Sequence, residues 1–359
     1  MDATTIPEDL NGEMESAIDW NNDIIAVFRR IAIYFNTLQP SGDISFSYLT
    51  EGAANTIWNV HFSHDSNLAR HDSSIVLRMR KDIASTIPML ELKEQFEKRI
   101  APLFAFNPGL LLPVHLIRLC PSVIEGMNRQ LHQLEATKHR KALRIGVYHP
   151  SFEIEPYAMV MPNLGYGPGK VVEFKPKWLA QSPSAPRNAQ RCRTCALNAM
   201  RRVKGVSGRG DSGFCPFDLL SSHDGILSSA LRQVWKDEKT LLEFVDAFRF
   251  EVQPALRQLQ KLQRQQGVVG LHDFLDPVDK DFSVAMALRD CSIVLKVVKS
   301  STQQESRLTI ATVKLLDLDL KDAGGGKLAK WARIEAELIE DGWYTTKEDT
   351  SIKCAMAFQ

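Results

Sequence analysis

Hydrophobic residues are concentrated in three short segments in the first quarter of the chain. β-Branched and aromatic residues recur in residues 46–49, 55–62 and 75–80. A glycine-containing turn at residues 50–54 joins the first two segments, and a polar stretch at residues 64–74 separates the second from the third. This pattern predicts a three-stranded antiparallel meander.

Apolar residues at three- and four-residue spacing predict helices in other parts of the chain. Residues 14–38 form an amphipathic helix pattern that is expected to dock on the fold, and residues 89–100 predict a helix after the third strand. Further helices are expected at 196–202, within 226–250 ahead of the helix breaker Pro254, and at 327–339. Further strands are expected at 157–161, 171–174, 292–298 and 308–317.

The composition is that of a globular protein, with 359 residues, 44% hydrophobic and 24% charged. At roughly 150 residues per domain, this length predicts two domains or lobes. No stretch approaches the ~18 apolar residues that a membrane span needs, and the acidic N-terminus lacks the apolar core of a secretory signal. Six unevenly spaced cysteines are typical of reduced thiols. We therefore expect an intracellular protein of the nucleus, the cytoplasm or both, monomeric and without a membrane partner.

Positive charge is concentrated in one part of the chain. The net charge is only +1, which argues against a general nucleic-acid binder. Residues 170–209, however, hold ten basic residues against one acidic residue, a local balance of +9. Beyond Trp178 this region is rich in Ser, Pro, Arg and Gly, and residues 181–212 are expected to be ordered but irregular around one short helix.

The turn around Gly52 is a candidate phosphate-binding loop. A residue without Cβ between two strands lets backbone N–H groups approach a phosphate, and protein kinases follow such a turn with a strand that carries a cation. Arg78 and Arg80 in the third predicted strand could supply that cation. An ordinary hairpin turn and a solvated strand face remain the alternatives for these two features.

Two lysines flank a proline in the sequence Lys175-Pro176-Lys177. Residues two apart in an extended segment point the same way, and the proline restricts the backbone between them. The two ammonium groups would therefore repel one another unless an anion lies between them. The alternative is an exposed turn.

Asp290 and Asp317 adjoin two predicted strands. Phosphoryl transfer needs one carboxylate to accept the hydroxyl proton and another to hold Mg²⁺ on the phosphates, and these two residues suit those roles. Caps or turns are the alternative interpretation.

Three cysteines and a histidine have the residue types of a structural zinc site. They are Cys192, Cys195, Cys215 and His223, and nineteen residues separate the second cysteine from the third. Three ordinary thiols are the alternative, and a redox pair is disfavoured because no thioredoxin-like βαβ unit surrounds them. Cys120, Cys291 and Cys354 are expected to be unligated.

Five motifs, taken together and in order, make the chain resemble the inositol-pentakisphosphate 2-kinases of the fungal type. They are residues 48–55, 76–78, 173–177, 289–292 and 317–321, and the resemblance extends over roughly residues 46–343. It implies ATP-dependent phosphorylation of the 2-hydroxyl of inositol 1,3,4,5,6-pentakisphosphate to give inositol hexakisphosphate (phytate). It also implies an α+β fold of two lobes, distantly like protein kinases, with an antiparallel N-lobe sheet and a larger mixed α/β C-lobe. The expected division is an extension at 1–45, an N-lobe at 46–162 and a C-lobe at 163–359.

The resemblance also assigns roles to residues. Asp290 would be the catalytic base, Asp317 a Mg²⁺ ligand and Asp319 a second metal candidate, while Lys175 would serve both catalysis and ATP binding. The expected ATP-binding residues are Gly52, Asn55, Arg78, Met161, Asn163 and Lys175. The expected substrate-binding residues are Arg144, Lys177, Lys321 and Lys327, with Lys330 and Trp331 as further guesses.

The local charge of +9 fits this assignment. A pentakisphosphate carries roughly eight or more negative charges, so its site must offer many donors. Arg201 and Arg202 on the predicted short helix are our preferred contributors. Arg187, Arg191 and Arg193 are equally compatible with solvated positions.

Two other functions compete with the pentakisphosphate kinase. One is a non-catalytic inositol-phosphate or RNA-binding protein that uses the basic region, and the other is a kinase of a different inositol phosphate. Asp290 and Asp317 favour catalysis, because a polyanion-binding module gains nothing from carboxylates beside its ligand. Nucleic acid is not expected, since only Phe174 and Trp178 lie among the basic residues as stacking aromatics.

Overall fold

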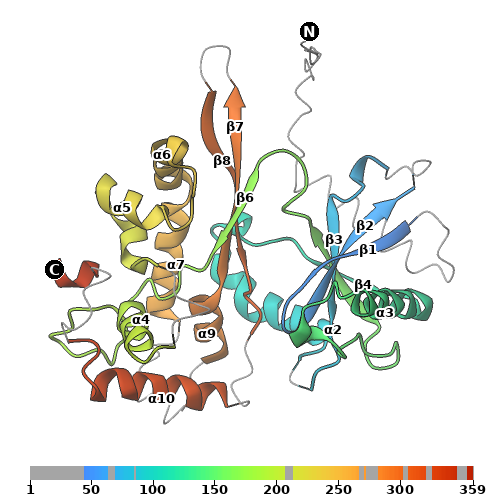
Figure 1. Cartoon of the computed structure of the whole chain (residues 1–359), viewed down its shortest axis with the longest axis horizontal. Coiled ribbons are helices and arrows are strands. Elements are labelled where there is room, and N and C mark those ends of the chain that lie inside the picture. Colours follow the sequence, from blue (N-terminus) through green and yellow to red (C-terminus); the bar gives the residue numbers. More distant parts are fainter. Residues whose placement is uncertain are drawn as a thin grey trace, which may run out of the picture.

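The computed structural model describes residues 44–63, 69–84, 86–206, 213–266, 271, 282–301, 306–320, 326–345 and 354–358. The chain forms two antiparallel β-sheets with helices around them, so the expected mixture of helices and antiparallel strands is confirmed (Figure 1). The helix expected at 14–38 and the substrate candidate Lys321 lie outside the described residues. Lys327 is described only by its backbone, at the start of a helix.

The first sheet has five strands in the order β1-β2-β3-β5-β4. Its strands are β1 (Ile44–Glu51), β2 (Asn55–Phe62), β3 (Ile75–Arg80), β4 (His115–Arg118) and β5 (Tyr157–Pro162). The predicted meander is confirmed as β1-β2-β3. In β2 every second side chain is buried, because one face of the strand packs on the core through Trp58, Val60 and Phe62. Helix α3 (Pro121–Ala136), which was not predicted, covers this face with Ile124, Met127 and Leu131.

Helix α2 (Met89–Gln95) starts the segment that joins β3 to β4 of the first sheet. It continues into a π-helical turn η2 (Phe96–Ile100) and two 3₁₀ turns, η3 (Ala101–Phe104) and η4 (Pro108–Leu110), which confirms the helix expected at 89–100. Side chains of these turns pack in the core of the second sheet. This segment therefore spans the two halves of the molecule.

The second sheet has three strands in the order β6 (Lys170–Phe174), β7 (Ser292–Ser301) and β8 (Ser306–Leu316). Helices gather beside it on the side away from the first sheet (Figure 1). They are α4 (Arg193–Val203), α5 (Asp224–Leu231), α6 (Leu241–Glu251), α7 (Gln253–Gln265), α9 (Phe282–Asp290) and α10 (Lys327–Glu340). Phe244, Phe248 and Leu259 of the helices pack with Ile293 and Leu295 of the central strand β7 to form the larger core.

The helices expected within 226–250 are confirmed as α5 and α6, and α6 ends at Glu251, ahead of Pro254. Pro254 itself lies in the first turn of the next helix, α7, which was not expected and where its missing N–H would have no intrahelical partner. The short helix expected at 196–202 is confirmed as α4, which buries seven side chains, Arg193 among them. Among the described residues, no helix combines the length and the apolarity needed to cross a bilayer.

Candidate active site

A cavity of about 380 Å³ lies where the two sheets face one another. Its walls are mostly apolar, with Leu92, Phe96, Val114 and Met161 among them. The lining also includes Gly52, Asn55 and three charged residues, Arg78, Asp317 and Asp319, and we call this part of the lining the charged end. A cavity with an apolar wall and a polar end suits a ligand that is a flat ring at one end and charged at the other.

The glycine turn that lines this cavity is anchored by buried charged side chains. The Gly52 N–H donates to the Asn55 carbonyl oxygen over 2.9 Å, and Lys81 Nζ donates to the Gly52 carbonyl oxygen over 2.9 Å. Lys81 also pairs with Glu51, whose two carboxylate oxygens each accept a hydrogen bond of 3.0 Å from Arg140. Burial raises the pKa of Glu51, but the hydrogen bonds from Arg140 and Lys81 outweigh it, and the pKa lies below its usual value. The turn is therefore anchored rather than loose.

Arg78 connects the first sheet to the segment that follows β8. Its guanidinium makes two hydrogen bonds to the Asp319 carboxylate, one of them Nη1 to Oδ1 over 3.2 Å. Burial lowers the pKa of Arg78, but the Asp319 charge outweighs it and raises the pKa above its usual value. The cation of β3 is thus fixed at the charged end of the cavity, as a bidentate pair.

Four side chains meet next to the first cavity, and one of them, Asp317, lines it. Lys175 Nζ donates to the Asp290 carbonyl oxygen over 2.7 Å and lies 3.1 Å from Asp317 Oδ2 and 3.4 Å from Asp290 Oδ2. Lys177 Nζ donates to Asp290 Oδ1 over 3.0 Å. Burial lowers the pKa of Lys175, but the two carboxylates outweigh it and hold the pKa above its usual value. The anion that lies between the two lysines in this structure is the carboxylate of Asp290.

Two of these residues have an unusual backbone. Lys177 and Asp317 adopt positive φ angles of 59° and 58°, which non-glycine residues rarely do. Such a conformation costs about 1 kcal/mol or more, and it persists only where the surrounding structure enforces it. Both residues lie at the junction of Lys175 with the two carboxylates, so the strain coincides with the candidate catalytic centre.

A second cavity of about 260 Å³ lies on the other side of Asp290. Among the described residues that line it, Asp290 is the one acidic residue. Five lining residues are basic, namely Lys177, Arg193, Arg201, Arg289 and Lys330. Trp178 and Trp331 form part of its wall. The cavity therefore has an excess of positive charge, as expected of a site for a polyanion.

Arg193 and Arg289 are fixed against the ring of Trp178. The guanidinium carbons lie 4.3 Å and 4.8 Å from the ring centre, respectively, within the range of cation–π contacts. Arg193 donates to Glu335 Oε2 over 2.8 Å, so it is buried and paired rather than solvated. Burial, with a smaller contribution from the charge of Arg193, lowers the pKa of Arg289 to about 10. A bound anion would relieve this repulsion between two guanidinium groups.

Several expected site residues lie elsewhere. The Asn163 side chain donates to the Ser73 carbonyl oxygen over 2.8 Å and accepts from the Gly165 N–H over 3.0 Å, so it holds the connection after β5 and does not line the first cavity. Arg144 lies near the glycine turn, where its charge acts on Tyr48 and Lys81, and outside the lining of the second cavity. Three more basic candidates, Arg187, Arg191 and Arg202, also lie outside the lining of the second cavity. Arg187 is exposed, and Arg202 follows Arg201 on α4. Arg191 is buried and donates to the Trp343 carbonyl oxygen.

The sequence did not single out Arg193 and Arg289 as cavity residues. For Arg289 a signal existed, because it precedes Asp290 directly in the motif Arg-Asp-Cys-Ser. For Arg193 none did, since its burial depends on Glu335, far away in the chain.

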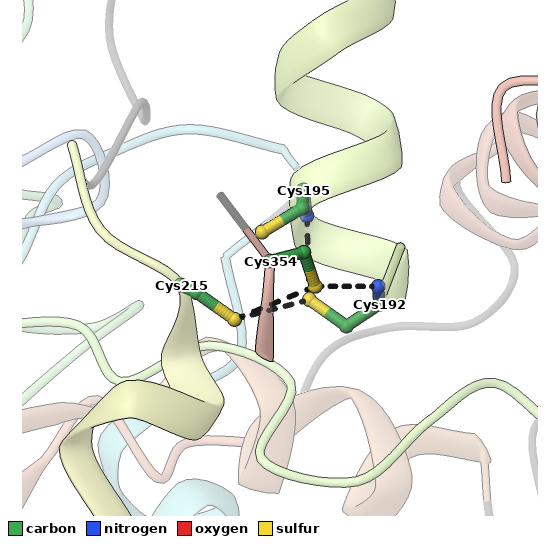
Figure 2. Close-up of side chains that lie close together, drawn as sticks. All are labelled: Cys192, Cys195, Cys215 and Cys354. Carbon is green, nitrogen blue, oxygen red and sulfur yellow. Dashed lines mark hydrogen bonds between the residues drawn. The ribbon is translucent and has the colours of Figure 1, made fainter. Parts of the chain in front are cut away.

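A separate cluster of four buried cysteines could hold a metal ion. Cys192, Cys195, Cys215 and Cys354 bring their sulfur atoms within 4.8 Å of one another (Figure 2). Two expectations need correction here. His223 is exposed at the start of α5 and lies outside the cluster, and Cys354, expected to be unligated, supplies the fourth sulfur.

Comparison with known proteins matches most of the chain. A family model described as inositol-pentakisphosphate 2-kinase matches residues 48–279 and 251–337. An inositol-pentakisphosphate 2-kinase of Yarrowia lipolytica is 29% identical over 212 residues, which are 53% of this chain and 66% of that relative. The match thus spans just under two thirds of the length of the relative.

Proposed function

The chain belongs to the inositol-pentakisphosphate 2-kinase family, and we propose that it transfers the γ-phosphoryl group of ATP to the 2-hydroxyl of inositol 1,3,4,5,6-pentakisphosphate. The products would be ADP and inositol hexakisphosphate. One observation carries this proposal: Lys175, Asp290 and Asp317 meet where an apolar-walled cavity adjoins a cation-lined one. A phosphoryl group can pass from a donor in the first cavity to an acceptor in the second only through such a junction.

The first cavity suits ATP. Its volume falls in the range of about 300–1,000 Å³ typical of small-molecule sites. The apolar wall with Met161 would receive the adenine, while the Gly52 turn and Arg78 would face the phosphates. Lys175, 3.1 Å from Asp317 in that lining, would contact the phosphoryl group that is transferred.

The carboxylates at the charged end fit a Mg²⁺ ion, which takes oxygen ligands from one or two carboxylates together with phosphates. Asp317 is the better ligand, because its side chain is 53% exposed and lines the first cavity. Asp319 also lines the cavity, but its carboxylate is engaged by Arg78, so it would have to share its oxygens. When bound, Mg²⁺ would neutralise charge on the β- and γ-phosphates.

The second cavity suits the inositol phosphate. Its five basic side chains would face a ligand with roughly eight or more negative charges. Asp290 lies in its wall, where a carboxylate oxygen could accept the proton of the attacking hydroxyl as the oxygen bonds to phosphorus. Lys177 donates to that carboxylate and faces the same cavity, so it would position both the base and the substrate.

The test is ADP formation by the full chain with Mg-ATP, with and without the pentakisphosphate. Asp317→Ala should abolish turnover. Asp341→Ala is a matched control, because Asp341 is also about half exposed and also pairs with a lysine, Lys204, but lies outside both cavities. If the wild type forms no ADP while the pentakisphosphate raises its melting temperature, the protein is a binding module and the proposed kinase activity is wrong.

A further inference from the structure

Four cysteines from three separate segments converge on one point (Figure 2). Cys192 caps the N-terminus of α4 and Cys195 lies in its first turn, whereas Cys215 precedes the 3₁₀ turn η6 (Pro216–Leu220) and Cys354 precedes η8 (Ala355–Phe358). All four side chains are buried, and none forms a disulfide. The chain thus gathers sulfur atoms that lie as far as 162 positions apart in the sequence.

The distances between the sulfur atoms match those of a metal tetrahedron. With a Zn–S distance of about 2.3 Å, two sulfurs of a tetrahedral site lie about 3.8 Å apart. Here Sγ of Cys215 lies 3.9 Å from Sγ of Cys192 and 3.7 Å from Sγ of Cys354. A disulfide would instead require about 2.05 Å between sulfurs.

The backbone supports the same interpretation. The Cys192 N–H points at Sγ of Cys354 over 3.1 Å, and the Cys195 N–H points at Sγ of Cys192 over 3.4 Å. Backbone donors of this kind form the outer shell that orients ligands in metal sites. They stabilise a sulfur that carries negative charge more than a neutral thiol.

We propose that Cys192, Cys195, Cys215 and Cys354 bind one Zn²⁺ ion as a closed structural site. Four protein ligands leave no open position for a water or a substrate, so the metal serves the fold and not the reaction. The side chains that pack around the cluster, Phe217, Ala355 and Met356, shield it from solvent.

The position of the site gives it a consequence for the second cavity. Helix α4 begins at Cys192 and Cys195, and it places Arg193, Leu197 and Arg201 in the wall of that cavity. The metal would therefore fix the start of the helix that presents two of the five cations. If zinc is lost, the KM for the pentakisphosphate should rise severalfold more than the KM for ATP. This expectation rests on the proposed function.

The test is the metal content of the purified full chain, measured by mass spectrometry without any substrate. We expect about one zinc per chain in the wild type, in His223→Ala and in Cys120→Ser, a control cysteine outside the cluster. Cys354→Ser should lose most of the zinc. Because this measurement needs no turnover, it is independent of whether the kinase assignment is correct.

A second measurement covers the case in which Cys354→Ser fails to fold. Wild-type protein reconstituted with Co²⁺ should show the intense thiolate-to-cobalt charge-transfer bands and the visible bands of a tetrahedral four-sulfur site. A wild type without stoichiometric metal, a wild type with iron in place of zinc, or a cobalt spectrum of fewer thiolates would each overturn the proposal. So would full zinc retention in folded Cys354→Ser.

Discussion

Replacing Lys177 by alanine should weaken binding of the inositol phosphate while leaving ATP binding nearly intact. Lys177 lines the second cavity and not the first, and its Nζ donates to Asp290 Oδ1 over 3.0 Å. Its side chain is only 23% exposed, so its charge is directed into the site rather than into water. Alanine keeps a Cβ at the positive φ of 59°, and the substitution therefore leaves the backbone strain in place.

The magnitude follows from the contact that is lost. A hydrogen bond from a charged donor to a phosphate oxygen contributes about 1.5–3 kcal/mol. At about 1.4 kcal/mol per factor of ten, the KM for the pentakisphosphate should rise about tenfold to a hundredfold. The KM for ATP should change by less than about threefold, because the nucleotide would occupy the other cavity.

The assay is steady-state ADP formation with each substrate varied in turn. Lys170→Ala is the matched control, since Lys170 lies in the same basic region but packs over the Trp235 ring at 4.2 Å, away from both cavities. Lys177→Arg should recover part of the affinity, because it restores a cation. Equal increases in both KM values for Lys177→Ala would refute the assignment of one substrate to each cavity.

Three further predictions test the base, a buried histidine and a buried ion pair. Asp290→Asn should lower kcat by a factor of about 10²–10⁴ with ATP affinity unchanged by calorimetry, and full turnover would remove Asp290 as the base. Burial lowers the pKa of His149 from 6.5 to about 4, so below pH 6.5 His149 binds a proton in the unfolded chain but not in the folded chain. The free energy of unfolding should therefore fall by about 3 kcal/mol between pH 6.5 and 4. A His149→Gln variant whose free energy of unfolding in urea falls equally over this range would contradict this cause. Glu335→Ala leaves the buried Arg193 without its carboxylate and should lower the free energy of unfolding in urea by about 3–5 kcal/mol. Glu337→Ala breaks the more exposed pair with Lys204 and should lower it by less than about 1 kcal/mol.

The sequence predicted the strands better than the helices of the larger half. Strand β2 buries every second side chain, and β3 is buried at all but one position, so apolar β-branched residues mark both segments directly. Helix α9 is buried almost all round and carries no periodic polar face to reveal it. For α7 the signal was present, because Leu256, Leu259 and Leu262 recur every three residues, but Pro254 fits the end of the preceding helix as well as the first turn of a new one.

In the candidate site, too, the sequence predicted some residues and missed others. Short motifs identified Lys175, Asp290 and Asp317, and the fold brings both carboxylates within 3.4 Å of Lys175 Nζ. The burial of Arg193 depends on Glu335 and the fourth sulfur on Cys354, 142 and 139 positions away from their partners. Local patterns carry no information about such contacts, since only the tertiary fold creates them.

Phosphorus NMR of the purified protein with Mg-ATP and inositol 1,3,4,5,6-pentakisphosphate tests the central claim most directly. The account predicts that the spectrum of inositol hexakisphosphate appears with the wild type and does not appear with Asp317→Ala. A new phosphate signal at any other position, or no product while the pentakisphosphate still protects the fold against heating, would contradict it.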